Sequence, residues 1–187
     1  MPPSITLSSL TFALPDGRVL FSDLNFSFNQ ERTGLIGNSG VGKSTLLKLV
    51  AGELAPSSGF VSVTVTVGVL RQMQALTLAD LFAVREVLAV LRKAEAGDAS
   101  AAELAHADWT LDARFAEALG RAGLEAAADT PLAELSGGQR TRAALAALVF
   151  AGPDFLLLDE PANNLDRDGR ARVAGMIAGW RGGALVV

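Results

Sequence analysis

The sequence has 187 residues, of which 50% are hydrophobic and 19% are charged, so the chain is long and apolar enough to bury a sizeable core. A formal net charge of −4 gives no support to a general electrostatic grip on DNA, and the absence of cysteine excludes disulfides and cysteine-bound zinc. We find neither a secretory signal pattern nor the run of about 20 apolar residues that a membrane-spanning helix needs. We therefore expect a cytoplasmic protein with no membrane insertion and no DNA partner.

The first third of the chain has the patterns of strands. SITLSSLTFAL (4–14) and LFSDLNFSF (20–28) are rich in β-branched and aromatic residues, and the turn Pro15–Gly17 separates them. FVSVTVTV alternates strictly from Val61 to Val67, which predicts one half-buried antiparallel strand. Between these runs, TGLIG (33–37) predicts a short strand, and the apolar spacing of KSTLLKLVAGEL (43–54) predicts a helix after a glycine-rich loop.

The rest of the chain begins with a helical region. From about Leu76 to Leu135 the composition shifts to Ala, Leu, Glu and Arg with helical periodicity, which predicts a helical lobe inserted in an α/β core. Beyond it we expect a helix over 139–150, a buried strand in FLLLD (155–159), a second helix over 170–180 and a final strand at 184–187.

GNSGVGKST, residues 37–45, matches the phosphate-loop pattern G-x-x-x-x-G-K-[ST], with a predicted strand before it and a helix after it. In such a loop several backbone N–H groups point at phosphates, and the helix start adds a favourable dipole. Lys43 would neutralise phosphate charge, and the Ser44 hydroxyl would hold Mg²⁺ with Thr45 nearby. An ordinary glycine-rich turn does not need this Lys-Ser pair. The predicted nucleotide-binding residues are Gly37, Asn38, Ser39, Gly40, Val41, Gly42, Lys43, Ser44 and Thr45.

FLLLDEP supplies a second part of the same site. Asp159 stands at the carboxyl end of the predicted strand, where an open parallel sheet brings its ligand-binding residues together. Asp159 would support the Mg²⁺ shell, and Glu160, pointing elsewhere, could polarise an attacking water. Alone, an Asp-Glu pair here would be read as a solvated helix cap. After a phosphate loop, it predicts a metal ligand and a general base.

LSGGQRTRAALA, residues 135–146, predicts a second anion site. Ser136 can cap a helix, while Gly137 and Gly138 leave the first N–H groups uncovered. Because one fold seldom offers its own nucleotide two separate phosphate cradles, the second cradle would serve the nucleotide of another molecule. A plain helix start is the alternative for this stretch taken alone.

With these motifs in this order, the chain resembles the nucleotide-binding domain of the ATP-binding cassette (ABC) superfamily over essentially its whole length. Two further motifs match: Gln72 in GVLRQ fits the Q-loop, and NNLD (163–166) fits the D-loop. The resemblance implies an α/β P-loop NTPase fold with an N-terminal antiparallel β subdomain and an inserted helical subdomain. The implied domains are 1–72 (β subdomain and phosphate-loop part of the ATP-binding core), 73–135 (helical subdomain) and 136–187 (the remainder of the core).

Members of this superfamily pair their cassettes head to tail, so that ATP and Mg²⁺ lie between one phosphate loop and the opposite Ser136-type loop. The resemblance implies Ser44, Gln72 and Asp159 as Mg²⁺ contacts, and Glu160, Gln72 and Lys43 as the catalytic residues. The ATP of the partner cassette would be contacted by Ser136, Gly137, Gly138 and Gln139. The seam between cassettes would contain Asn163, Asn164 and Asp166.

Two family contacts depart from the pattern. The aromatic residue that usually stacks on adenine aligns with Leu14, and Phe12 lies two residues away, as either an alternative base contact or a core residue. The last strand of the family ends in a switch histidine, whereas GALVV has none and the only histidine is His106 in the helical lobe. We therefore expect a truncated cassette that binds ATP but hydrolyses it poorly.

SGGQRTRAALA and DEPANNLD look like the ABC-F group, which carries two cassettes in one chain without a membrane domain, and many of whose members act on ribosomes. The expected partners are thus a second cassette, in the same full-length chain or in a homodimer, and the ribosome. The alternative is the ATP-binding subunit of an ABC membrane transporter, which often reads SGGQRQR and SALD. A scaffold in which ATP only locks a dimer is a third reading.

Overall fold

The structure, a computed structural model, describes residues 4–71, 76–105 and 107–187. Its contacts divide the chain into two compact units. The first contains Met1–Leu70, Gly152–Asn163 and Gly179–Val187, and the second contains Arg71–Ala151 and Asn164–Ala178. The second unit begins close to the expected start of the helical lobe. It also takes in the helix that follows residue 136, so the domain assignment of residues 136–187 stays a prediction.

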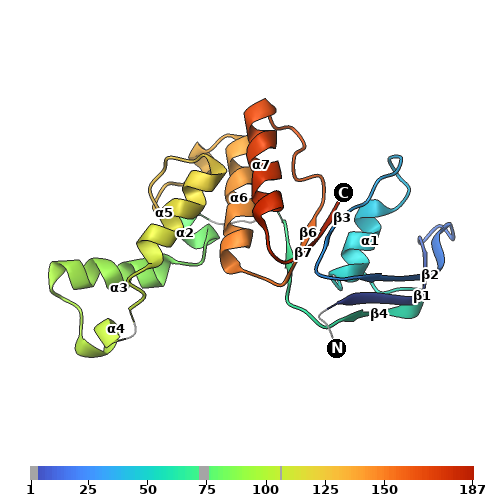
Figure 1. Ribbon diagram of the computed structural model, residues 1–187, viewed down its shortest axis with the longest axis horizontal. Coiled ribbons are helices and arrows are strands. Elements are labelled where there is room, and N and C mark those ends of the chain that lie inside the picture. The colour runs from blue at the N-terminus through green and yellow to red at the C-terminus, as the bar shows by residue number, and fades with distance from the viewer. Residues whose placement is uncertain (1–3, 72–75, 106) are drawn as a thin grey trace. The chain divides into compact units, whose positions relative to one another are not determined.

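The first unit holds an antiparallel sheet in the order β2-β1-β4, formed by β1 (Ile5–Ala13), β2 (Val19–Phe28) and β4 (Ser58–Val63) (Figure 1). The first two predicted strands are confirmed, and they pair with each other antiparallel. The strand pairing in this sheet is irregular near Ser9 (φ 45°) and Asp23 (φ 50°), whose backbones are both left-handed. Gly59 of β4 lies beside β1 near Ser9, where a Cβ would lie 2.3 Å from the Ser9 carbonyl oxygen.

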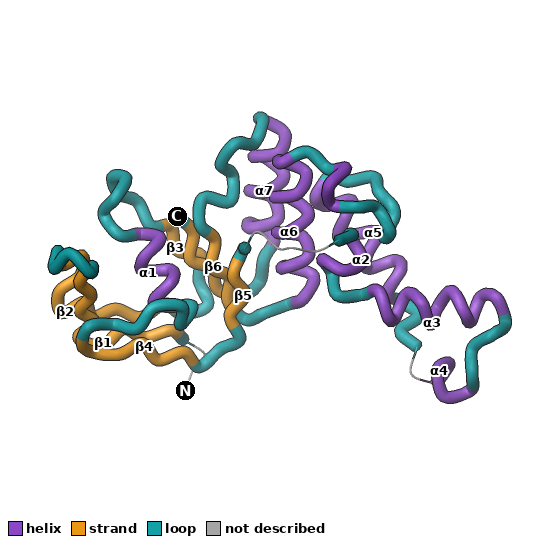
Figure 2. Tube along the Cα trace, turned by 180° about the vertical axis from the view of Figure 1, so that it is seen from behind, coloured by secondary structure: helices purple, strands orange, loops and turns teal. Residues whose placement is uncertain are grey.

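The second sheet of this unit is parallel, in the order β3-β7-β6-β5. Figure 2 labels β3, β6 and β5 of this sheet. It consists of β3 (Arg32–Gly34), β5 (Val67–Val69), β6 (Phe155–Leu158) and β7 (Gly183–Val186). All four residues of β6 are buried, as expected for a strand that lies between two others and is covered on both faces. A buried cluster from β1, α1 (Lys43–Val50), β6 and β7 forms the core beside it.

The expectation of one antiparallel strand from Val61 to Val67 is wrong. The chain leaves the antiparallel sheet after Val63 and enters the parallel sheet at Val67. Asp154 fixes this break, because its Oδ2 accepts hydrogen bonds from the backbone N (2.9 Å) and the hydroxyl (2.7 Å) of Thr66. These bonds lower the pKa of Asp154, the hydroxyl contact contributing most.

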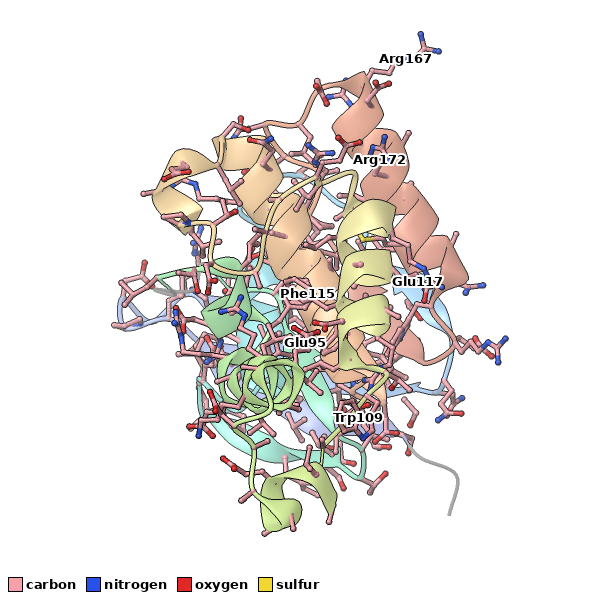
Figure 3. All side chains as sticks on the ribbon, turned by 90° about the vertical axis from the view of Figure 1, so that its left-hand side faces the viewer. Glu95, Trp109, Phe115, Glu117, Arg167 and Arg172 are labelled. Carbon is pink, nitrogen blue, oxygen red and sulfur yellow. The ribbon has the colours of Figure 1, made fainter. Side chains whose placement is uncertain are left out.

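The second unit is helical, as predicted. Its elements are α2 (Leu78–Leu81), α3 (Arg85–Ala96), α4 (Ala101–Ala105), α5 (Leu111–Ala122), the short 3₁₀ helix η1 (Leu132–Glu134), α6 (Gly137–Ala151) and α7 (Arg167–Gly179), whose last residue belongs to the first unit. Phe82 packs edge-on against Phe115 at 4.9 Å and against Phe150 at 5.4 Å between ring centroids. Figure 3 shows Phe115 on α5, and Arg167 projecting from the first turn of α7. Within the described ranges, no helix is long and apolar enough to cross a membrane.

The close approach of Gly59 to the Ser9 carbonyl gives a test of the packing of β4 beside β1. Gly59→Ala should lower the free energy of unfolding by about 3 kcal/mol or more, because it adds backbone strain and a clash with the Ser9 carbonyl. Gly17→Ala is the matched control, since Gly17 is also left-handed (φ 85°) but has open space where a Cβ would go. It should cost only about 1 kcal/mol. Urea unfolding of both variants would measure the difference, and equal losses would contradict this packing.

Candidate functional site

The phosphate loop runs from the end of β3 into α1. Gly40 (φ 80°) and Gly42 (φ 102°) take left-handed conformations that other residues adopt only with strain. Gly42 is the N-cap of α1, and this fully described helix has neither a side-chain cap nor an acidic residue in its first turn. The N–H groups and the dipole at this helix start are therefore available to an anion such as a phosphate.

An aromatic ring packs against the same loop. A Cβ at Gly42 would lie 2.9 Å from Cζ of Phe21, so the β2 ring occupies the space that a side chain there would need. Phe21 pairs in register with Phe12 of β1, and both pack against the core cluster. Leu14 is half-buried in the hairpin turn, where its N–H donates to the Arg18 carbonyl at 2.9 Å. Phe12 is thus half-buried against the core, and the adenine contact, by Leu14 or by Phe12, stays a prediction.

The side chains of Lys43 and Ser44 both form hydrogen bonds at the loop. Lys43 Nζ curls over the loop and donates to the carbonyl oxygens of Gly37 (2.8 Å) and Asn38 (3.0 Å). The Ser44 hydroxyl donates to Oδ1 of Asp159 at 3.1 Å, although 115 positions separate the two residues. Their two oxygens are of the kind that Mg²⁺ prefers, and the geometry therefore fits a magnesium ion beside a triphosphate.

Ser44 and Asp159 would supply two oxygens for a Mg²⁺ shell. Among the described residues, no three His, Cys, Asp or Glu side chains gather into a metal site. Mg²⁺ bound through one or two protein oxygens usually keeps several waters and takes the remaining ligands from substrate phosphates. Two protein oxygens are therefore compatible with a nucleotide-bound Mg²⁺.

Glu160 follows Asp159 directly but has a different environment. Its backbone is left-handed (φ 44°), and its N–H donates to the carbonyl of Val187 at 3.1 Å. Its side chain is exposed, and Oε2 accepts a hydrogen bond of 2.7 Å from Nδ2 of Asn163. This contact was not predicted, because no residue pattern signals a left-handed Glu. The role of Glu160 as general base stays a prediction.

The loop at Ser136 begins α6 with reciprocal capping bonds. The Ser136 hydroxyl accepts from the backbone N of Gln139 at 3.2 Å, and Oε1 of Gln139 accepts from the backbone N of Ser136 at 2.8 Å. Gly137 has open space where a Cβ would lie, whereas a Cβ at Gly138 would come within 3.1 Å of the Leu165 side chain. The predicted helix cap is confirmed, and contact with a partner's ATP stays a prediction.

The D-loop residues are divided between the two units. Asn163 belongs to the first unit, whereas Asn164 (φ 58°) and Asp166 belong to the second. Oδ1 of Asp166 accepts from the backbone N of Gly169 at 2.7 Å and so caps the first turn of α7. The sequence missed this structural role of Asp166. That these residues lie at a seam between cassettes stays a prediction.

Gln72 and His106 lie outside the described residues, so the metal and catalytic roles expected of Gln72 stay predictions.

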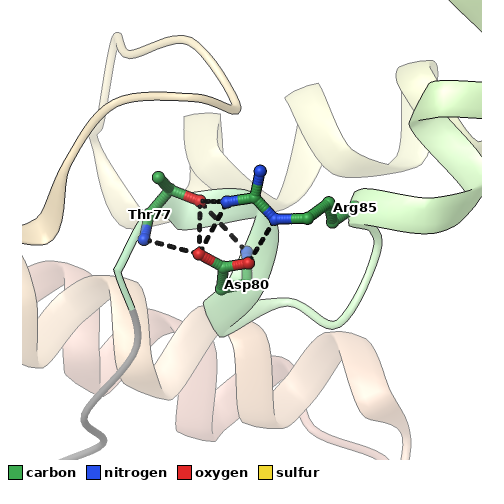
Figure 4. Close-up of polar contacts among 3 residues, drawn as sticks. All are labelled: Thr77, Asp80 and Arg85. Atoms are coloured by element: carbon green, nitrogen blue, oxygen red, sulfur yellow. Dashed lines mark hydrogen bonds and ion pairs between the residues drawn. The ribbon is translucent and has the colours of Figure 1, made fainter.

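Soon after Gln72, a polar cluster of Thr77, Asp80 and Arg85 fixes the start of the helical unit (Figure 4). Thr77 and Asp80 form a capping box on α2, and Arg85 Nη2 donates to Asp80 Oδ2 at 2.7 Å. These bonds, from Arg85 first and Thr77 second, hold the pKa of the Asp80 carboxyl well below its usual range.

The comparisons with known proteins decide the family. The sequence profile of the ABC transporter family matches residues 21–163. The chain belongs to the ABC transporter family. It is 37% identical over 191 residues to ABC transporter F family member 3 of Arabidopsis thaliana, an alignment that covers 100% of this chain and 24% of the relative. It is also 33% identical over 196 residues to the energy-dependent translational throttle protein EttA of Mycobacterium tuberculosis, covering 91% of this chain and 35% of that protein.

A solved structure agrees on the fold. The ABC domain cbiO1 from Clostridium perfringens, part of the transporter complex cbiONQ, superposes with a TM-score of 0.68 at 23% identity, covering 100% of this chain and 78% of that one. The expected α/β fold of an ABC nucleotide-binding domain is therefore confirmed, as is the likeness to the F group. The chain spans about a quarter to a third of the length of these curated relatives.

Removing the loop lysine tests the phosphate site. Lys43→Ala should weaken ATP binding by at least about tenfold, because a charge-assisted contact to phosphate is lost. Lys48→Ala is the matched control, since Lys48 lies exposed in the last turn of the same helix. Isothermal titration with ATP and Mg²⁺ would measure both affinities. Equal affinities for the two variants would contradict the assignment of this loop.

The cluster around Asp80 gives a pH-dependent prediction. Because the folded-state pKa of Asp80 is lowered, its stabilising effect should be fully present above its ordinary value near 4 and should fade as the pH falls below it. Asp80→Asn should therefore lower the melting temperature clearly at pH 7. The gap in melting temperature between the variant and the original protein should narrow toward pH 3. Asp98→Asn, an exposed carboxyl of the same unit, serves as the control. A gap that does not change with pH would argue against the cluster.

Proposed function

We propose that this chain binds ATP with Mg²⁺ and hydrolyses it, as a cassette of the ABC-F type that switches by pairing with another cassette. The observation that supports this best is the hydrogen bond between the Ser44 hydroxyl and Asp159. It joins the end of the phosphate loop to the end of β6 at 3.1 Å, and the Lys43 ammonium lies over the same loop. One metal-bound triphosphate would use all three groups.

The roles of the residues follow from their chemistry. Lys43 and the N–H groups at the start of α1 would bind the β- and γ-phosphates. Ser44 and Asp159, with Gln72, would hold Mg²⁺, which when bound neutralises negative charge on the phosphates. Glu160 would accept the proton of the attacking water at its carboxylate, and general base catalysis of this kind contributes about 10²–10⁴-fold. Leu14 would pack against the adenine.

The loop of Ser136, Gly137, Gly138 and Gln139 would bind the ATP held by another cassette. This second cassette lies in the same full-length chain or in a second copy, with Asn163, Asn164 and Asp166 at the seam. The size of the relatives supports the first arrangement, because the chain matches only 24% and 35% of their lengths. ATP would then join the two cassettes, and hydrolysis would release them.

We propose that the switch acts on ribosomes in the cytoplasm. The support is the likeness to EttA, a translational throttle protein, together with the DEPANNLD and SGGQRTRAALA motifs. The likeness to a transporter component concerns the fold alone, at 23% identity. We predict that a polypeptide of these 187 residues by itself hydrolyses ATP slowly. Its only histidine is His106, so it lacks the switch histidine that the family resemblance places at the end of the last strand.

The function is tested with Glu160→Gln. Single-turnover hydrolysis of labelled ATP, with the chain in excess and followed over hours, should be slow in the original chain and should fall by about 10²-fold or to the detection limit in the variant. ATP affinity should stay within about twofold, since the substitution keeps the shape of the side chain and the phosphate loop intact. Glu31→Gln, an exposed residue of the same unit, is the control. Hydrolysis unaffected by Glu160→Gln would contradict the proposed mechanism.

A further inference from the structure

We propose that Asn163 is a positioning residue for Glu160: its side-chain amide holds one carboxylate oxygen, so that the other is presented to the attacking water. The proposal rests on the proposed function, in which Glu160 is the general base. It assigns Asn163 a role inside its own cassette, in addition to the seam between cassettes.

The geometry is local and involves both parts of Asn163. Its Nδ2 donates to Oε2 of Glu160 at 2.7 Å, a short bond for an amide and a carboxylate. Its backbone N donates to the carbonyl oxygen of Glu160 at 3.0 Å and closes the turn between the two residues. The same turn holds the left-handed backbone of Glu160 (φ 44°). The amide and the carboxylate therefore face each other across a single tight turn.

Glu160 needs such a partner because of where it lies. The residue is exposed, and a glutamate side chain loses more conformational entropy than most when it is held in one rotamer. A general base has to stay within about 3 Å of the water whose proton it takes. Fixing the carboxylate before the nucleotide binds removes that ordering step from the reaction.

An amide suits this task better than a charged donor. It occupies one of the two carboxylate oxygens with a neutral N–H, so Oε1 keeps its capacity to accept the proton from water. A lysine or arginine at the same place would form an ion pair and make the carboxylate a weaker base. The bond thus orients Glu160 without neutralising it.

The contact itself can be observed without hydrolysis. In ¹⁵N-labelled chain, the side-chain amide proton of Asn163 that is bonded to Glu160 should resonate downfield of its position in a free asparagine amide, as expected for a hydrogen bond to a carboxylate. Glu160→Ala should return this proton to the position of a free asparagine amide, whereas Glu160→Gln, which keeps an acceptor oxygen, should leave most of the shift. Signals that do not respond to Glu160→Ala would overturn the proposal.

Kinetics separate positioning from a purely structural role. Asn163→Ala should slow single-turnover hydrolysis by roughly five- to tenfold with ATP affinity unchanged, because only the orientation of the base is lost. Asn163→Asp has the same shape but no donor and a repelling charge, so it should be slower still. Asn163→Gln keeps the amide and should recover part of the rate. Asn29→Ala, an exposed asparagine of the same unit, should have no effect.

The outcomes distinguish this proposal from the proposed function. If the original chain hydrolyses ATP and Asn163→Ala is equally fast or faster, the positioning role is wrong while the function stands. If the three Asn163 variants are slowed equally, the residue only stabilises the turn, and the positioning role is again overturned. If the original chain does not bind or hydrolyse ATP, the proposed function fails and the role of Asn163 falls with it.

Discussion

The candidate site depends on the burial of β6. All four side chains of this strand are enclosed, and it lies between β7 and β5 in the parallel sheet. A strand held on both edges and both faces has little freedom, so the two residues that follow it leave the sheet at a fixed place. Asp159 meets the Ser44 hydroxyl there at 3.1 Å, which joins two motifs that are 115 positions apart. Apolar packing thus sets the position of a polar site.

The two carboxylates after β6 have different partners and so suit different chemistry. Asp159 is held by a hydroxyl at the end of the phosphate loop, as a metal ligand should be. Glu160 is left-handed, is tied by its backbone to Val187, and has its side chain held by Asn163. The two adjacent acids thus have different hydrogen-bond partners, as their separate proposed roles require.

The sequence predicted the parts of the site that lie in short contiguous motifs. The phosphate loop, the strand before Asp159 and the helix start at Ser136 each combine a residue pattern with an element type, and these elements were confirmed. The break between β4 and β5 was missed because the alternation of Val and Thr continues through it. That break depends on Asp154, 88 positions from Thr66. The contact between Asn163 and Glu160 was missed because it depends on a backbone angle that no residue pattern signals.

The central claim is that Ser44 and Asp159 bind ATP through Mg²⁺, and the magnesium dependence of ATP affinity tests it most directly. Isothermal titration would compare ATP binding in Mg²⁺ and in excess EDTA, for the original chain and for Ser44→Ala. The account predicts that Mg²⁺ tightens binding to the original chain by at least about tenfold, and that most of this gain disappears in the variant. Binding of equal strength with and without Mg²⁺ in the original chain would contradict it.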